Sequence, residues 1–489
     1  MEQIFKNIKN HYLILSGIIF LYITMSSSAI TDNQMVYGEM QSHYIFQRLA
    51  DGLILYQDII PLYGPVFYEI GTILQLFGIS YTGFKIVMLG VAILSGLLVF
   101  LITKQVFKNY NLALVATGIY IFLPIHYGVA PVFHPDSFAV LLFLASLLFL
   151  IKNTKISFIV AGIISVSAIF VKIPVLPLVI VPIIYFVIYR KKIGIYYIVP
   201  FLVISIIVFI LILELNENLD NTKFIVDSLL NNPDNPLNIL RDFIWIEGLA
   251  FLLAVVGFFI YLKNKEKNKL LVFVSIASLF PVAAILLPGV GIYEANYIEP
   301  FIAIFAAFLI FYVMENWKWK KINKKIIPII LLSLVIIQIS IFTWPDRERI
   351  ADWDGDRWAF QLNEVADGHS LLLEKYTKNG DLVVASSMAA FRTERILPFE
   401  NPYQDLLKIK SGFNYKSSIN EIEGIYSLLE NKKIKMLISF NSTERNDKKY
   451  SGLQNNLFFP YYTDSFVKII DENYEKYSEN GFNYFIPKS

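Results

Sequence analysis

The sequence contains no cysteine, and this absence excludes disulfide bonds, thiol catalysis and cysteine-based metal sites. Charged residues are also scarce, at 17% of the chain, whereas an average soluble domain has about 25%. The formal net charge of +2 does not indicate a nucleic-acid partner, because such proteins carry a strongly basic surface. The composition therefore indicates a protein in which apolar residues dominate.

Hydrophobic residues make up 56% of the chain and are unevenly distributed. Residues 11–344 form a series of apolar blocks, whereas residues 345–489 have the composition of a soluble domain. We therefore predict a membrane domain over 1–344 and a water-exposed domain over 345–489. Runs of about 17–25 apolar residues predict about eleven spanning helices, the first of them uncleaved. They cover residues 12–31, 83–103, 111–130, 137–151, 156–171, 173–189, 195–213, 244–262, 270–288, 297–314 and 326–344.

The segment 66–78 is apolar too, but it is too short to span and contains Glu69, so we expect an interfacial helix. With this choice, most Lys and Arg residues of the loops fall on the side of the N-terminus. The opposite side of the membrane domain keeps only Arg48, Lys85, Lys172, Lys223 and Arg241. Because cytoplasmic loops are rich in Lys and Arg, we predict a multi-pass plasma-membrane protein with a cytoplasmic N-terminus and an extracytoplasmic C-terminal domain.

The first external loop, residues 32–82, gathers carboxylates, prolines and aromatic residues. Residues 39–51 have helical spacing, and Gly52 is expected to end that helix. Pro61, Gly64 and Pro65 then interrupt the chain before the interfacial segment. Cytoplasmic loops are by contrast short and basic, so any chemistry is expected on the outer face.

Several short motifs in and after this loop occur in a recognisable order. They are Glu39, the run Gly52-Leu-Ile-Leu-Tyr56-Gln-Asp58, Gly64-Pro65 and Phe77-Gly78, followed by His134-Pro135-Asp136, Val171-Lys172, Tyr293–Pro300 and Gly380–Ser386. This order and spacing resemble the GT-C glycosyltransferases. The likeness is to the branch containing the dolichyl-phosphate-mannose–protein mannosyltransferases and the bacterial aminoarabinose transferases of lipid A, and it covers nearly the whole chain.

The resemblance implies a polytopic α-helical membrane protein of GT-C type. Interfacial helices would lie in its first external loop, and a small α/β domain would follow outside the membrane. The implied enzyme is an inverting hexosyl- or pentosyltransferase. It would take a sugar from a polyprenyl- or dolichyl-phosphate carrier and pass it to a lipid, glycan or protein acceptor, in protein glycosylation or cell-envelope assembly.

The resemblance also implies catalytic roles in the first loop. Glu39 matches the family's first-loop acid and is the expected catalytic base. Asp32 is the reserve candidate, because many members have an adjacent acidic pair where this chain has Gly38-Glu39. Tyr56 and Asp58 fill the Tyr-x-Asp positions and are expected to bind sugar or acceptor, or to have a structural role.

Lys172 is the strongest candidate for binding the lipid phosphate of the donor. It lies within an otherwise apolar run, where a lysine is costly unless it has a partner or a function. Pro174 and Pro177 are expected to break the helix beside it. Snorkelling of the side chain to water is the simpler alternative. Arg48 and Arg241 are further phosphate-binding candidates, although either is also explained as an ordinary loop arginine. Apart from Lys172, intramembrane charge is expected to be nearly absent.

The remaining candidates for sugar or acceptor binding lie at the outer ends of two spans: His134, Asp136, Tyr293, Asn296 and Tyr297. For Asp136, a favourable interaction with a helix dipole is an equally good explanation. No metal motif such as His-Glu-x-x-His occurs, and the acidic run 352–358 lacks the spacing of a calcium loop. We therefore expect no metal and no other cofactor.

Alternating elements predict the α/β domain: helices over 356–378 and from the capping box at 418–421 to 432, and strands over 381–386, 435–440 and 482–486. Asn441-Ser-Thr443 is a glycosylation sequon. Two other functions stay open, a transporter or flippase and a non-catalytic subunit of envelope glycan assembly. Against a transporter, the sequence shows no internal repeat.

Overall fold

The computed structural model describes the chain in stretches that hold most of the membrane domain and part of the C-terminal domain. The described residues are 2–31, 37–56, 63–129, 132–215, 236–264, 267–284, 292–316, 333, 336–337, 368–384, 427–439, 464–479 and 482–488. The chain divides into two compact units. The helical unit consists of Met1–Asn33 and Pro61–Asp356, and the sheet unit of Gln34–Ile60 and Arg357–Ser489. The expected domain boundary at residue 344 stays a prediction.

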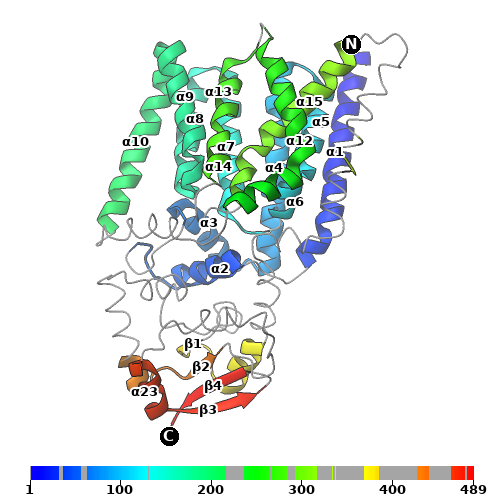
Figure 1. The fold of residues 1–489 in the computed structure, drawn as a ribbon. Helices are drawn as coiled ribbons and strands as arrows, with labels where there is room; N and C mark the ends of the chain where they lie inside the picture. The colour runs from blue at the N-terminus through cyan, green and yellow to red at the C-terminus, as the bar shows by residue number, and fades with distance from the viewer. Residues whose placement is uncertain are drawn as a thin grey trace. The chain divides into compact units, whose positions relative to one another are not determined.

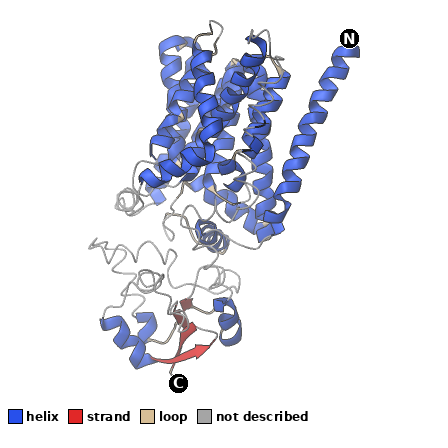
Figure 2. Cartoon of the chain, turned by 45° about the vertical axis from the view of Figure 1, so that its right-hand side comes forward, coloured by secondary structure: helices blue, strands red, loops and turns tan. Residues whose placement is uncertain are grey.

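The described part of the helical unit is a bundle of long helices side by side, with α3 crosswise to them (Figures 1 and 2). Its helices are α1 (Glu2–Thr31), α3 (Pro65–Leu76), α4 (Tyr81–Phe107), α5 (Tyr110–Phe122), α6 (Pro124–Val129), α7 (Pro135–Lys152), α8 (Lys155–Val171), α9 (Leu176–Tyr189), α10 (Lys191–Leu215), α12 (Pro236–Leu262), α13 (Lys269–Ala277), α14 (Leu279–Ala284) and α15 (Glu299–Asn316). Two 3-10 turns, η1 (Ile173–Val175) and η2 (Ile292–Tyr297), lie between them.

Helix boundaries follow from local sequence. Ser80 begins α4 by accepting a hydrogen bond from the Gly83 N–H at 3.3 Å. Thr154 and Ser157 form a reciprocal capping box at the start of α8. Pro135 is the first residue of α7, where a missing N–H costs nothing. These signals place α7 and α8, which pack against each other, and so determine where the ends of both helices lie.

Helices lie at the expected positions wherever the structure describes them, but two expected spans are interrupted. The segment 111–130 is divided at Pro124, because a proline disfavours helix at the residue before it, so α5 ends at Phe122. The segment 270–288 is divided at Ser278, because Pro281 clashes with the carbonyl four residues earlier. The last expected span, 326–344, lies almost entirely outside the described residues.

Four of the described helices are long and apolar enough to cross a membrane: Tyr81–Phe107, Pro135–Lys152, Lys191–Glu214 and Glu299–Asn316. In α10 the apolar side chains of Leu202, Ile206 and Phe209 are exposed, as expected for a helix that faces lipid. The helical unit is therefore that of a polytopic membrane protein. The expected number of eleven spans stays a prediction.

Close contacts between helices depend on glycine. A Cβ at Gly257 in α12 would lie 2.2 Å from the Phe305 carbonyl oxygen in α15, and a Cβ at Gly162 in α8 would lie 2.6 Å from the Tyr197 carbonyl oxygen in α10. Small residues of this kind let membrane helices approach through their backbones. They place α12 directly against α15, and both helices contribute to the site described below.

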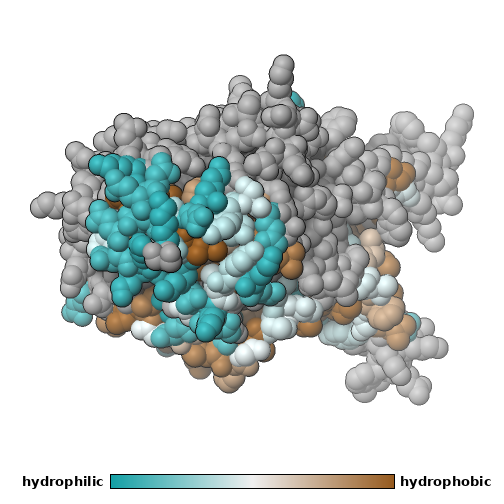
Figure 3. Space-filling view, turned by 90° about the horizontal axis from the view of Figure 1, so that it is seen from below, coloured by the Kyte–Doolittle hydropathy of each residue, from teal (hydrophilic) through white to brown (hydrophobic). Residues whose placement is uncertain are grey.

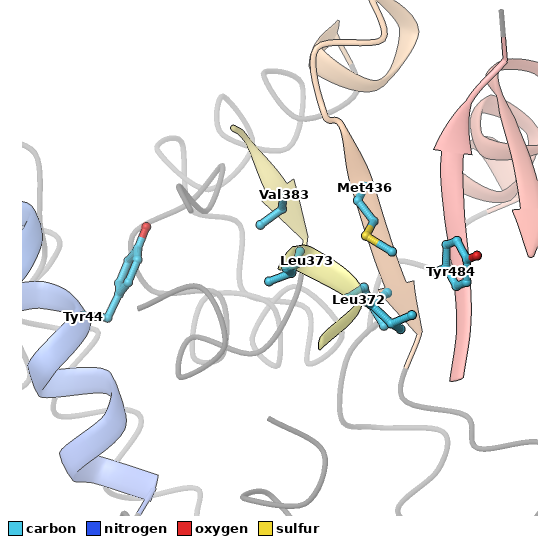
Figure 4. Packing of buried hydrophobic residues seen from close by; sticks show 7 residues of the cluster. Tyr44, Leu372, Leu373, Val383, Met436 and Tyr484 are labelled. Carbon is cyan, nitrogen blue, oxygen red and sulfur yellow. The ribbon is translucent and has the colours of Figure 1, made fainter. Parts of the chain in front are cut away.

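The sheet unit contains α2 (Tyr37–Ala50), short helices over 368–376 and 427–430, and α23 (Asp464–Asn473). Its strands are β1 (Val383–Val384), β2 (Met436–Ser439), β3 (Tyr474–Glu479) and β4 (Phe482–Pro487). The strand order is β1-β2-β4-β3, with β1 and β2 parallel and the other pairs antiparallel. Leu372, Leu373, Val383, Met436 and Tyr484 form its core, which Tyr44 of α2 joins (Figure 4).

The described elements agree with the expected α/β pattern, with two additions. The strands expected over 381–386, 435–440 and 482–486 are present as β1, β2 and β4, and helix is present within 368–376 and 427–430. Helix α23 and strand β3 are not expected from the sequence. The side chains of strand β3 are mostly exposed, and most of them are polar. The described surface of this unit is mainly hydrophilic (Figure 3). The capping box at 418–421 and the sequon at Asn441 lie outside the described residues.

Candidate active site

Asp136 is the centre of a polar cluster in the helical unit. It is the second residue of α7 and is fully buried. Its Oδ2 lies 2.7 Å from the Lys172 Nζ and 2.7 Å from the His134 Nδ1. Its Oδ1 accepts a hydrogen bond of 2.7 Å from the Tyr297 hydroxyl. Groups from three segments therefore compensate one carboxylate that has been withdrawn from water.

Lys172 reaches this carboxylate because the chain breaks at that position. Helix α8 ends at Val171, and Lys172 is extended, with φ −155° and ψ 128°. The turn η1 and then α9 follow, with Pro174 in the turn and Pro177 in the first turn of α9, as expected. The lysine side chain is 13% exposed. An ion pair with a buried carboxylate, and not snorkelling alone, therefore determines where the ammonium lies.

The segment before α3 packs against the same break. The Gly64 N–H donates a hydrogen bond of 3.0 Å to the Val171 carbonyl oxygen. A Cβ on Gly64 would lie 2.0 Å from the Phe170 carbonyl oxygen, so no other residue fits here without moving the backbone. The Tyr63 ring centroid lies 5.9 Å from the Lys172 Nζ and 5.9 Å from the His134 ring centroid. The Gly64-Pro65 motif of the first loop, with Tyr63 directly before it, thus lies at the lysine.

This cluster is suited to holding an anion. An ammonium is a three-proton donor, and its contact with Asp136 fixes its direction before any ligand arrives. Preorganised donors in a site withdrawn from water stabilise negative charge more strongly than they do in solution.

Comparison with solved structures identifies the architecture. The structure of ArnT, the aminoarabinose transferase from Cupriavidus metallidurans, bound to undecaprenyl phosphate aligns with a TM-score of 0.63. The two chains are 11% identical, and the alignment covers 98% of this chain and 97% of that one. The chain has the GT-C fold. The apo structure of ArnT from the same organism gives a TM-score of 0.61 at 11% identity, covering 96% and 98% of the two chains.

An oligosaccharyltransferase from Archaeoglobus fulgidus in the apo form gives a TM-score of 0.43 at 12% identity, covering 88% of this chain and 69% of that one. No protein-family model and no curated protein sequence matches the chain. The likeness to ArnT therefore concerns the GT-C fold, and the roles of individual residues must be argued from the geometry of this chain.

Within the GT-C fold, the other expected phosphate-binding residues are not part of the described Asp136 cluster. Arg48 lies on α2 in the sheet unit, where its Nη1 pairs with Asp51 Oδ2 at 3.1 Å. Arg241 is exposed in the second turn of α12. Asn296, expected to bind sugar or acceptor, is buried beside the cluster residue Tyr297 and has no described contact with Asp136.

The expected catalytic residues of the first loop are only partly described. Glu39 lies in the first turn of α2 and Tyr293 lies in η2, but neither side chain is among those described. Asp32 and Asp58 lie outside the described residues. Tyr56 has a φ of +71°, a left-handed conformation that non-glycine residues rarely adopt and that is common at functional sites.

The expectation that Lys172 is nearly alone as an intramembrane charge is wrong. Glu247 and Glu299 both lie inside expected spans, and both are fully buried. The sequence indicates both residues, because a carboxylate within an apolar run is as costly as a lysine and so suggests a partner or a function.

Within the described part of the chain, no three His, Asp or Glu side chains are gathered as metal ligands. The expectation of no metal stays a prediction.

Proposed function

We propose that this protein is an inverting glycosyltransferase that uses a polyprenyl- or dolichyl-phosphate sugar as its donor. The observation that carries the proposal is the Asp136–Lys172 ion pair with Tyr63 and Gly64 packed against it, in a chain with the GT-C fold. The pair fixes the Lys172 ammonium at the end of α8, where Gly64 of the first-loop motif contacts the backbone. Neither a plain apolar bundle nor an ordinary loop lysine would require that arrangement.

Lys172 is proposed to stabilise the leaving group. As the bond between the anomeric carbon and the phosphate oxygen breaks, its electron pair stays on that oxygen and the lipid phosphate gains negative charge. A fixed ammonium beside that oxygen lowers the barrier because the interaction strengthens as the charge develops. Asp136 would hold the ammonium in place, and Tyr297 would hold Asp136.

Glu39 is proposed as the general base. Its carboxylate would accept the proton of the acceptor hydroxyl while that oxygen forms the new bond to the anomeric carbon from the side opposite the phosphate. This requires a distance of about 2.6–3.2 Å between the carboxylate and the hydroxyl in the productive complex. Asp32 is the reserve base. Tyr56, Asp58, His134, Tyr293 and Asn296 are proposed to bind sugar or acceptor.

The ArnT structure is bound to undecaprenyl phosphate, which supports a polyprenyl-phosphate carrier for this chain as well. The acceptor is proposed to be a lipid, glycan or protein on the outer side of the plasma membrane. This location follows from the Lys and Arg distribution, which favours a cytoplasmic N-terminus.

The test is sugar transfer by the full-length protein in liposomes, with a panel of synthetic polyprenyl- and dolichyl-phosphate sugars. We expect turnover with at least one donor and loss of turnover in E39Q, because glutamine cannot accept the proton. E69Q is the matched control, since Glu69 is an exposed carboxylate on α3 in the same loop. Wild-type turnover in E39Q would overturn the base assignment. No turnover of any donor by the wild-type protein would favour the transporter or subunit alternatives.

A further inference from the structure

Two buried glutamates from different helices bind the start of α6. The Ile125 N–H donates a hydrogen bond of 3.2 Å to Glu247 Oε1, and the His126 N–H donates one of 2.8 Å to Glu299 Oε1. Glu247 belongs to α12 and Glu299 is the first residue of α15. Both side chains are 0% exposed. The first amides of α6 are therefore satisfied by two carboxyl groups that are entirely withdrawn from water.

The second oxygen of each carboxyl group, Oε2, accepts no hydrogen bond from a described N–H or O–H group. Neither Glu247 Oε2 nor Glu299 Oε2 has a hydrogen-bond partner among the described residues when both groups are ionised. The two carboxyl groups lie side by side, because they bind the backbone N–H groups of adjacent residues, Ile125 and His126. A carboxylate only accepts hydrogen bonds, whereas a protonated carboxyl group also donates one. A single proton between them would satisfy both oxygens.

The surroundings favour that single proton over two negative charges. Two ionised carboxylates side by side repel each other and lose their hydration. Neither glutamate forms an ion pair with a described Lys or Arg. The titratable groups that face the pair in the described residues are Tyr120 of α5 and His126 of α6, whose rings are 4.3 Å apart. Neither is a permanent cation.

The pair is also joined to the candidate active site through the chain. Helix α6 is followed by the short segment that leads to His134 and Asp136. Glu299 lies two residues after Tyr297, whose hydroxyl binds Asp136. The carboxyl pair thus holds the two segments from which the aspartate and its tyrosine partner come.

We infer that Glu247 and Glu299 share one proton and are positioning residues for the Asp136–Lys172 site. The carboxyl pair locks α6 to α12 and α15, and this fixes His134 and Asp136 on one side and Tyr297 on the other. The effect on transfer rests on the proposed function, whereas the shared proton does not.

The proton is tested by infrared difference spectroscopy of the full-length protein in detergent. Wild type is expected to show the carbonyl stretch of a protonated carboxyl group that shifts in deuterated solvent. E247Q and E299Q should each lose this band. In both variants the glutamine amide donates the hydrogen bond, so the remaining carboxyl group stays ionised. E69Q is the control and should retain it. Persistence of the band in both glutamine variants, or its absence from wild type, overturns the inference.

The positioning role is tested with the same variants in the transfer assay. E247Q and E299Q retain one donor and one acceptor and should transfer sugar at a rate close to wild type. E247A and E299A each remove one carboxyl group that binds a backbone N–H of α6. In these variants kcat should fall on the order of 10²-fold, because the reacting groups move apart. Equal activity of the alanine and glutamine variants would overturn the role. If no donor supports transfer, the infrared measurement still decides whether the proton is shared.

Discussion

The residue that most constrains the candidate site is Asp136. It has no exposure to water and is in contact with Lys172, His134 and Tyr297. A buried ion pair of this kind contributes little by itself, but removing one partner leaves the other charge uncompensated. Asp136 is therefore expected to affect both the stability of the fold and the proposed sugar transfer.

Replacing Asp136 with alanine should destabilise the protein by about 3–5 kcal/mol, because Lys172 then lacks its buried counter-charge. D136A/K172M should recover much of this loss, since neither charge remains. The measurement is the unfolding midpoint of the full-length protein in detergent. The control is D51A, which breaks the exposed pair with Arg48 and should cost at most about 1 kcal/mol. Equal effects of D136A and D51A would contradict this energetic role.

His369 gives the sheet unit a pH dependence. Its ring is fully buried against Phe482, and burial lowers its pKa from 6.5 to about 3. Between these two values the unfolded chain binds a proton that the folded chain does not, so stability is complete above pH 6.5 and falls as the pH decreases. From pH 6.5 to pH 5 the loss should be about 2 kcal/mol.

Hydrogen exchange of residues 368–384 in the full-length protein measures this loss. Exchange should accelerate as the pH falls from 6.5 to 5, after correction for the intrinsic rate, and H369F should remove most of the acceleration. An unchanged pH dependence in H369F would show that another group is responsible.

At the scale of elements, helix contacts depend on positions where no side chain fits. G257A should push α12 away from α15, because the new Cβ would lie 2.2 Å from the Phe305 carbonyl oxygen. A backbone atom cannot rotate away, so we expect a loss of a few kcal/mol, as in other overpacked contacts. The matched control is G248A on the same helix, where nothing lies within 4 Å of the new Cβ. The unfolding midpoint should fall in G257A only.

Much of the element pattern can be predicted from the sequence, because apolar run length and positive-inside charge are local properties. The break at Lys172 is predictable for the same reason, since Pro174 and Pro177 are beside it. Strand β3 is not, because an exposed polar strand has no apolar signature. The division of α13 from α14 at Ser278 follows from Pro281, a single residue inside an otherwise apolar run that by length predicts one span.

The candidate site is only partly predictable. Lys172 is a candidate because it lies in an apolar run, and His134, Asp136 and Tyr297 are candidates through the family resemblance. Their convergence depends on packing between residues far apart in the chain, such as the 2.7 Å contact of Tyr297 with Asp136. The Glu247–Glu299 pair shows the same limit, because two isolated acids in apolar runs do not reveal that they bind one helix start.

At the scale of the whole molecule, the cysteine-free sequence allows a clean test of orientation. Single cysteines replace the exposed Lys476 of β3 and the exposed Lys263 after α12. A membrane-impermeant maleimide should label K476C in intact cells and K263C only after permeabilisation, because basic loops face the cytoplasm. The reverse pattern would contradict the assigned orientation.

The central claim is that the Lys172 ammonium acts on the phosphate of a lipid-linked sugar. The most direct measurement is sugar transfer in liposomes by wild type and by D136N/K172Q, a variant that keeps hydrogen-bonding groups but removes both charges. K155Q is the control, because Lys155 is an exposed lysine at the other end of α8. With unchanged unfolding midpoints, the account predicts that D136N/K172Q loses transfer by about 10²–10³-fold while K155Q keeps it. Transfer by D136N/K172Q at the wild-type rate would contradict the account.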